Sequence, residues 1–212
     1  MDAAVTHALL VEGILTVAQA EDLINELSVL TGCTTDLDQQ LAKTNLWLQK
    51  MGRRVNKVPD IRTEEWCLVP TSTRDVPHAQ VAQAKFNRMA AALFAKPKSY
   101  IVPVEAFSSL DISEDELNGF IEEGWVVRCD QGIYPGTRLL LQSTNYLVDE
   151  LGVTSLVECA SCTKFVVFGY FCANDDCQFT IHRRCKPPYW RMKRYETDAC
   201  PDCGHTLPEP NN

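Results

Sequence analysis

The stretch CASCTKFVVFGYFCANDDCQFTIHRRC, from Cys159 to Cys185, holds five cysteines and one histidine, and two further cysteines follow it. Together these eight side chains form four close pairs: Cys159 with Cys162, Cys172 with Cys177, His182 with Cys185, and Cys200 with Cys203. Two tetrahedral Zn2+ sites need eight soft or borderline donors, and a short gap lets a tight turn aim both members of a pair at one ion. The spacing therefore predicts two zinc sites.

Spacing alone leaves open how the eight ligands divide between two ions. The intervening TKFVVFGYF is β-branched and aromatic, which suits a hairpin-like arm that returns the third pair to the first. We therefore expect an interleaved division, with one ion held by Cys159, Cys162, His182 and Cys185 and the other by Cys172, Cys177, Cys200 and Cys203. Alternatives are a sequential division, a single ion with spare cysteines, and His205 as a ligand in place of His182. Because protein fills every coordination position, both ions are expected to be structural and neither to activate water.

The distribution of cysteines also predicts a domain boundary. The 212 residues, 45% of them hydrophobic, suffice for one large domain or two to three small ones. Of ten cysteines, only Cys33, Cys67 and Cys129 precede the paired set, and we interpret these three as small buried hydrophobes. The change in composition places a boundary between Gly152 and Val157.

The sequence also predicts the cellular compartment of the protein. No basic leader opens the chain, and no apolar run approaches the roughly 20 residues that span a bilayer. We therefore expect a soluble intracellular protein, in which reduced thiols serve as metal ligands rather than in disulfides.

The residues before this boundary predict two winged-helix units. In the first, AAVTHALLVEGIL and TVAQAEDLINELSVL are amphipathic, Thr16 is a candidate N-cap, and a third helix runs from near Thr35 to Gly52, before the hairpin pattern RRVNKVPDIRTEEWCLVPT. The second repeats this order, with a capping box at Ser113 and Glu116 and a hairpin in WVVRCDQGIYPG. The predicted fold is α+β: winged-helix domain A over residues 1–73, winged-helix domain B over 74–152, and a variant RING zinc finger over 153–212.

The ligand order C4HC3 is similar to that of the PHD finger and of a variant RING. PHD fingers commonly carry an aromatic residue two positions before the seventh ligand, where this chain has Asp198. Trp190 and Pro201 stand where RING domains place an aromatic residue and a proline. The RING resemblance implies that these two residues line a groove for a ubiquitin-conjugating enzyme, while packing against the zinc core is the alternative for Trp190. Ser161 and Gly204 depart from the residues common in active RING ligases.

Tandem winged helices before such a finger resemble the non-SMC-element-one family, the RING-like subunit of the structural-maintenance-of-chromosomes five-six complex. The phrase LNGFIEEGWVVRCDQGIYPGTRLLLQ and the eight ligands carry the resemblance. It implies a nuclear E3 ubiquitin ligase subunit acting in DNA repair and chromosome maintenance, with a MAGE-type subunit and a kleisin subunit as partners. The alternative is a non-catalytic zinc-finger adaptor or chromatin-interaction subunit.

Charge and composition also bear on other functions. No glycine-rich phosphate loop is present, and His7 and His78 lie far from any isolated cysteine in sequence, so we predict no catalytic residues. The bases after His182 are interpreted as offsetting a charge of roughly minus three on the zinc-bound thiolates: Arg183, Arg184, Lys186, Arg191, Lys193 and Arg194. The alternative is a patch that binds DNA or an acidic partner.

We expect little DNA binding by the chain alone, because ISEDELNGFIEEG carries five acids and no base. The basic wing of Arg53, Arg54 and Lys57 is expected to give only weak, salt-sensitive contact. We expect the MAGE-type subunit to cover a hydrophobic patch, and the isolated chain to be poorly soluble without it. The patch is expected either on the second winged-helix unit or at the N-terminus, where apolar residues such as Leu9, Leu10, Ile14 and Leu15 recur.

Overall fold

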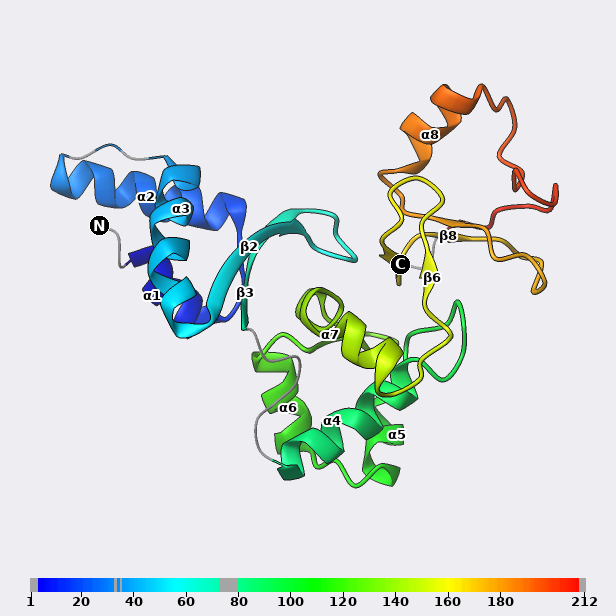
Figure 1. Cartoon of the computed structure of the whole chain (residues 1–212), viewed down its shortest axis with the longest axis horizontal. Helices are drawn as coiled ribbons and strands as arrows, with labels where there is room; N and C mark the ends of the chain where they lie inside the picture. Colours follow the sequence, from blue (N-terminus) through cyan, green and yellow to red (C-terminus); the bar gives the residue numbers. More distant parts are fainter. Residues whose placement is uncertain (1–3, 33, 35, 73–79, 210–212) are drawn as a thin grey trace.

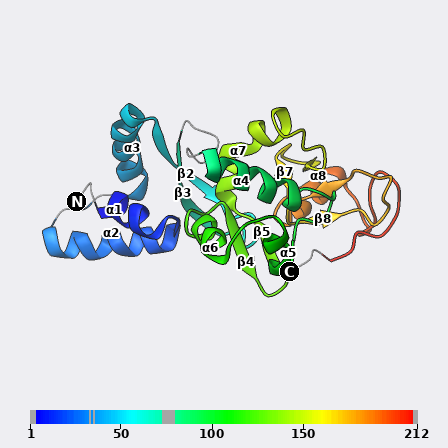
Figure 2. The same ribbon diagram turned by 90° about the horizontal axis from the view of Figure 1, so that it is seen from below.

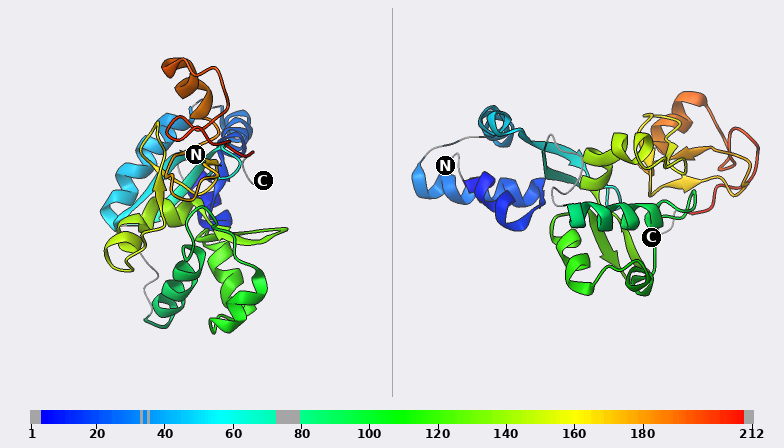
Figure 3. Two further views of the ribbon diagram at one scale, coloured as in Figure 1. Left: turned by 90° about the vertical axis from the view of Figure 1, so that its right-hand side faces the viewer. Right: turned by 60° about the horizontal axis from the view of Figure 1, so that its bottom comes forward.

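The structure is a computed structural model that describes residues 4–32, 34, 36–72 and 80–209. We call residues 4–72 the first unit, residues 80–152 the second unit, and residues 153–209 the finger (Figure 1). The helices of the first unit and the finger lie at opposite ends of the molecule, with the second unit between them (Figures 2 and 3). Cys33, Thr35 and His78, which figured in the sequence predictions, fall outside the described residues.

The first unit has the predicted order of three helices and a hairpin. Its elements are α1 (Ala4–Glu12), β1 (Leu15–Thr16), α2 (Val17–Thr31), α3 (Leu37–Leu48), the 3-10 turn Gln49–Met51, β2 (Arg53–Pro59) and β3 (Trp66–Ser72). The sheet is antiparallel in the order β1-β3-β2, with Leu15 opposite Leu68. Thr16 caps α2 in a reciprocal box with Gln19, as predicted for this N-cap. Helix α3 begins after Asp36, whose carboxylate accepts the Gln39 amide at 2.8 Å.

The core of the first unit corrects one sequence prediction. Leu9 and Leu15 belong to this core and are only 3% and 7% exposed, so an exposed N-terminal patch built on them is wrong. Val5 and Leu9 of α1 lie in the core that the helix forms with α2 and the sheet, so these two side chains are covered within the first unit. Exposed large apolar side chains of this unit lie elsewhere, at Val29, Leu30, Leu46, Trp47, Met51 and Trp66.

The second unit repeats the plan with a smaller sheet. It comprises α4 (Gln80–Leu93), α5 (Val104–Ser109), α6 (Glu114–Glu122), β4 (Val126–Cys129), β5 (Gly132–Pro135) and α7 (Thr137–Asp149). The predicted capping box forms, with the Ser113 hydroxyl accepting the Glu116 amide and the Glu116 carboxylate accepting the Ser113 amide. Before α5, a single antiparallel bridge joins Val102 to Ile133 of β5. A Cβ at Gly132 would lie 2.3 Å from the Val102 carbonyl oxygen, so this close approach requires glycine.

The core of the second unit continues into the finger. Its fully buried members include Phe86, Trp125 and Leu147, and Val167 and Phe168 of the finger belong to the same cluster. The finger and the second unit therefore share one apolar core, although the composition of the chain changes sharply between them.

The finger is built from two small hairpins and one helix. The hairpins pair β6 (Val157–Glu158) with β7 (Phe165–Val166) and β8 (Tyr170–Phe171) with β9 (Thr180–Ile181), and α8 (Lys186–Lys193) follows. Two prolines occupy the first turn of α8, where a missing N–H costs nothing, and Arg194 in a left-handed conformation ends it. In the described part of the chain, no helix is long and apolar enough to cross a membrane.

Candidate zinc centre

The first metal group joins the tip of the β6–β7 hairpin to the segment between β9 and α8. Its donors are one sulfur or ring nitrogen from each of Cys159, Cys162, His182 and Cys185, and these atoms all lie within 4.8 Å of one another. The His182 Nδ1 is 3.4 Å from the Cys162 sulfur and 3.9 Å from the Cys185 sulfur. Donors about 2.0–2.3 Å from a tetrahedral zinc stand about 3.3–3.8 Å apart. The group therefore fits one zinc ion.

The imidazole of His182 is oriented by the backbone of the first hairpin. Its Nε2 lies 3.2 Å from the Phe165 carbonyl oxygen. An N–H on Nε2 donating to that carbonyl leaves the Nδ1 lone pair facing the thiols, the arrangement in which a histidine binds a metal. The histidine of the H-x2-C pair thus has both a metal-facing nitrogen and a partner that fixes its tautomer.

The second metal group gathers the remaining four cysteines, Cys172, Cys177, Cys200 and Cys203. The Cys172 and Cys203 sulfurs are 3.3 Å apart, and the Cys177 and Cys200 sulfurs are 3.7 Å apart. These separations also fit one zinc ion. The described residues thus form two groups, with the interleaved membership expected from sequence, and the C4HC3 set fits two zinc ions.

His205 lies outside both groups, in contrast to the alternative that made it a ligand. Its side chain is exposed, and its Nδ1 approaches the Cys203 carbonyl at 3.3 Å. Its own carbonyl accepts the Cys200 amide at 2.7 Å, which closes the turn between the last two cysteines.

The cysteine thiols of the first metal group differ in their pKa values. Burial raises the pKa of Cys159, but hydrogen bonds from His182 and from backbone amides outweigh it and hold this pKa at about 6. Burial, followed by the charges of Cys159 and Cys162, raises the pKa of Cys185 to about 12. Cys159 therefore ionises readily, whereas a bound cation must displace the proton of Cys185.

Helix α8 carries Trp190, the residue predicted to bind a conjugating enzyme. Its indole Nε1 donates to the Thr197 carbonyl at 2.8 Å, and its ring packs near Phe179, Tyr189 and Tyr195 at centroid distances of 5.5–6.1 Å. Trp190 is half-buried, so it both supports the zinc core and presents part of its ring to solvent.

The bases near the zinc groups are partly engaged within the finger. The Lys186 ammonium is 2.8 Å from the Asp198 carboxylate and 4.2 Å from the centroid of the Tyr170 ring. Asp198, the residue that departs from the PHD pattern, therefore acts as an ion-pair partner of α8. Pro201 is half-buried within the turn between Cys200 and Cys203.

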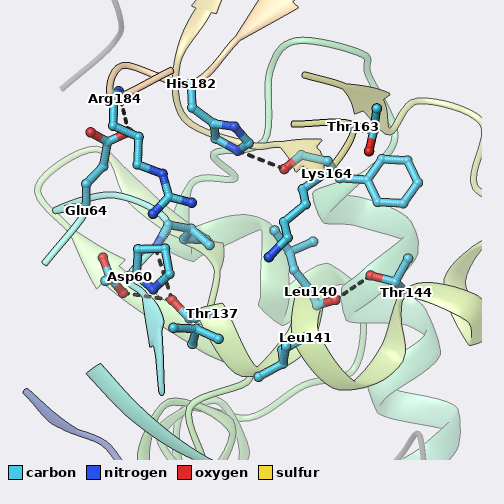
Figure 4. A pocket seen from close by; sticks show the side chains of 14 residues that line it. Asp60, Glu64, Thr137, Leu140, Leu141, Thr144, Thr163, Lys164, His182 and Arg184 are labelled. Atoms are coloured by element: carbon cyan, nitrogen blue, oxygen red, sulfur yellow. Dashed lines mark hydrogen bonds between the residues drawn. The ribbon is translucent and has the colours of Figure 1, made fainter. Parts of the chain in front are cut away.

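All three units meet at a cavity of about 340 Å3 beside the first metal group (Figure 4). The β2–β3 hairpin contributes Asp60 and Glu64, helix α7 contributes Leu140 and Leu141, and the finger contributes His182 and its neighbours. Several polar residues that line the cavity form hydrogen bonds between the units. Thr137 donates to Asp60 at 2.8 Å, and Glu64 accepts the Arg184 amide at 3.1 Å. The cavity therefore lies at a junction that the hairpin of the first unit helps to hold together.

Sequence reasoning missed these junction residues. The PDIRT segment signals a turn, because the Asp60 side chain accepts the amides of Arg62 and Thr63, but no local pattern shows that its other oxygen reaches Thr137.

The finger defines the class of protein to which this chain is related: residues 159–203 match the RING-like domain family. Over its whole length the chain shares its fold with a chain of a solved structure described as the Nse1-Nse3-Nse4 complex. That match has a TM-score of 0.76 at 16% sequence identity and covers 98% of this chain and 96% of the other. The architecture is thus two winged-helix units followed by a RING-like domain. No curated protein matches this sequence.

Proposed function

We propose that the chain is an Nse1-like, RING-type E3 ubiquitin ligase subunit of a chromosome-maintenance complex. The observation that carries the proposal is the pair of interleaved metal groups whose ligands flank α8, the helix that carries the half-buried Trp190. The fold shared with a chain of the Nse1-Nse3-Nse4 complex, over nearly all of both chains, supports the same assignment. Such a subunit acts in the nucleus, in DNA repair and recombination, with its domains at residues 1–73, 74–152 and 153–212.

In this function the eight donors Cys159, Cys162, Cys172, Cys177, His182, Cys185, Cys200 and Cys203 hold two structural zinc ions. The metals fix the shape of the finger and take no part in bond making. Trp190 and Pro201 contact the conjugating enzyme, which carries the activated ubiquitin itself. The chain positions the conjugating enzyme and does not supply a nucleophile.

Partner subunits of the MAGE and kleisin types complete the proposed assembly. Support for a protein rather than a duplex partner comes from charge. Lys57 of the basic wing is neutralised by Asp38 at 3.0 Å, and the first turn of α6 carries Glu114, Asp115 and Glu116. Phosphate binding needs free bases on such surfaces, so we propose negligible duplex binding by the chain alone.

A ubiquitin-discharge assay tests the proposal. The zinc-loaded chain, alone and with a MAGE-type partner, is mixed with a conjugating enzyme charged with ubiquitin, and release of ubiquitin to free lysine is followed. Accelerated discharge with the partner supports the ligase. Discharge at the background rate across a panel of conjugating enzymes, together with a stable heterodimer, supports the second candidate, a non-catalytic adaptor. The bond between the Trp190 indole and Thr197 favours that candidate, because it ties the indole to the finger.

A further inference from the structure

Lys98 makes an unusual set of contacts with the second metal group. It lies in the loop between α4 and α5 of the second unit, and its ammonium donates to three backbone carbonyls of the finger. The acceptors are Cys172 at 3.1 Å, Asn174 at 2.9 Å and Cys177 at 2.9 Å. An ammonium has three N–H donors, so these bonds use all of them. All three acceptors belong to the turn that presents Cys172 and Cys177.

We propose that Lys98 is a positioning residue of the second zinc site, which it holds in a metal-binding shape from outside the finger. Its role is to fix the turn between Cys172 and Cys177 and to offset the negative charge of the bound thiolates. The role is independent of ubiquitin transfer.

The turn needs such support because it is two residues longer than the other cysteine turns. In the first group, the Thr163 amide donates back to the Cys159 carbonyl at 3.0 Å. In the last pair, the Gly204 amide donates to the Cys200 carbonyl at 2.8 Å. Each short turn is thus closed by its own backbone.

The longer turn is closed differently. The amides of Cys177 and Asp176 donate to Asn174, both at 3.1 Å, and the Cys172 amide donates across the base of the turn to the Phe179 carbonyl at 3.1 Å, so none of these bonds uses the Cys172 carbonyl. The Cys172 carbonyl accepts from Lys98 instead. The ammonium therefore occupies the place that a backbone amide fills in the shorter turns.

Charge favours the same arrangement. Four thiolates around one dication carry a net charge of about minus two. Asp175 and Asp176, both exposed in the same turn, add charge of the same sign. A half-buried ammonium bonded to this backbone offsets part of that charge at short range.

The loop around Lys98 is anchored independently of its side chain. The Tyr100 hydroxyl donates to the Ser155 carbonyl at 2.7 Å, and the Ser155 hydroxyl donates to the Phe94 carbonyl at 2.6 Å. Lys98 itself has φ of 61°, a left-handed conformation that is costly for a residue with a Cβ. A glycine would adopt this backbone conformation at a lower cost. The contacts that the lysine side chain makes therefore explain why a lysine is found in it.

Zinc release from the full chain loaded with two ions tests the proposal. Lys98→Met removes the ammonium and keeps most of the alkyl chain, whereas Lys98→Gly removes the side chain and relieves the backbone. Lys98→Arg keeps the charge, and Lys96→Met alters an exposed lysine of the same loop as a matched control. Release is followed with the chromogenic chelator 4-(2-pyridylazo)resorcinol. His182→Ala, expected to retain only the second-site ion, assigns the kinetic phases.

We expect Lys98→Met and Lys98→Gly to accelerate release from the second site by about tenfold or more, because charge-assisted hydrogen bonds are lost. Release from the first site should not change, Lys98→Arg should restore most of the retention, and Lys96→Met should match the original chain. Unchanged second-site release in Lys98→Gly overturns the proposal. Equal acceleration of both phases also overturns it, because that result describes general destabilisation rather than support of one metal site.

Discussion

The ring of Phe168 in the finger lies edge-to-face against the ring of Tyr134 in the second unit, with 4.9 Å between centroids. Both side chains are buried, and both belong to the apolar cluster centred on Phe86 and Trp125. The finger therefore does not depend on its metal groups alone. Part of its folding free energy comes from burial against the second winged helix, and the two parts should unfold together.

Phe168→Ala tests this coupling. Truncating a buried phenylalanine leaves a cavity that typically costs about 3–5 kcal/mol of unfolding free energy. Urea denaturation of the zinc-loaded chain should show a single transition at lower urea, with the finger and the second unit unfolding together. Phe168→Leu should cost less, and Met192→Ala, at a side chain 68% exposed, should cost about 0.5 kcal/mol or less. Loss of the finger's signal alone in Phe168→Ala, with the second unit unaffected, would contradict the shared core.

The zinc content of two variants should distinguish the roles of the two histidines near the cysteines. His182→Ala should reduce zinc from two ions per chain to one, because its Nδ1 faces three thiols of the first group. His205→Ala should retain both ions, since this exposed side chain lies outside both groups. Elemental analysis measures the zinc content per mole of purified chain for both variants. In a separate experiment, removing both ions with a chelator should unfold the finger. One ion or none in the unaltered chain would refute the two-site assignment.

Trp190→Ala distinguishes a partner-binding role from a core role. If Trp190 binds the conjugating enzyme, the variant should lose ubiquitin discharge at least about tenfold while retaining both zinc ions, as expected for an aromatic contact at the centre of an interface. Trp190→Phe keeps an aromatic ring but removes the five-membered ring of the indole with the N–H that donates to Thr197, so it should keep more activity than Trp190→Ala. Zinc loss in Trp190→Ala would instead assign the ring to the core of the finger.

Cys67 is expected to be chemically inert in the folded chain. Burial, followed by the charge of Asp60, raises the pKa of its thiol to about 12, and its sulfur lies 3.2 Å from the Val58 carbonyl oxygen. Because the pKa lies above its ordinary value of 9.0, the thiolate fraction at pH 8 falls roughly a thousandfold. N-ethylmaleimide at pH 8, followed by peptide mass mapping, should leave Cys67 unmodified in the folded chain and alkylated in urea. Rapid native labelling would show that the β2–β3 hairpin opens readily.

Local features were predictable from sequence. Thr16 and Ser113 cap their helices because the hydroxyl accepts the backbone amide of a Gln or Glu three residues later, whose side chain accepts the backbone amide of the capping residue, without any tertiary contact. The membership of the two metal groups was also predictable, because close pairing of cysteines restricts the geometry and a β-branched arm between pairs favours interleaving.

Long-range features were not predictable in this way. Lys98 reaches acceptors 74 to 79 residues away, and nothing in its own segment marks it. Leu9 illustrates the same limit. An apolar periodicity predicts which face of a helix is buried, but it does not show whether the core of the same unit or a partner protein covers that face. Phe168 lies within the cysteine-rich segment, and composition therefore assigned it to the finger while packing places it in the core of the second unit.

The end of α3 carries one of the exposed apolar surfaces of the first unit. Leu46 and Trp47 near the end of α3, and Met51 in the 3-10 turn that follows it, are 69%, 55% and 51% exposed. Exposed apolar groups this large are costly to hydrate, and aromatic residues in such patches commonly dominate binding. This surface replaces the N-terminal patch expected from sequence as the proposed contact for a MAGE-type subunit.

Trp47→Asp is the sharpest test of that surface. Because the side chain is more than half exposed, the substitution should change the free energy of unfolding by only about 0.5 kcal/mol, yet it places a charge in the proposed contact. We expect the dissociation constant of the heterodimer with a MAGE-type subunit to rise about 30-fold or more, as for loss of an interface tryptophan worth about 2 kcal/mol. Val148→Asp, on the exposed face of α7 in the second unit, is the matched control and should bind normally. Isothermal titration of both variants measures the effect, and equal affinity of Trp47→Asp and the unaltered chain would move the partner contact away from α3.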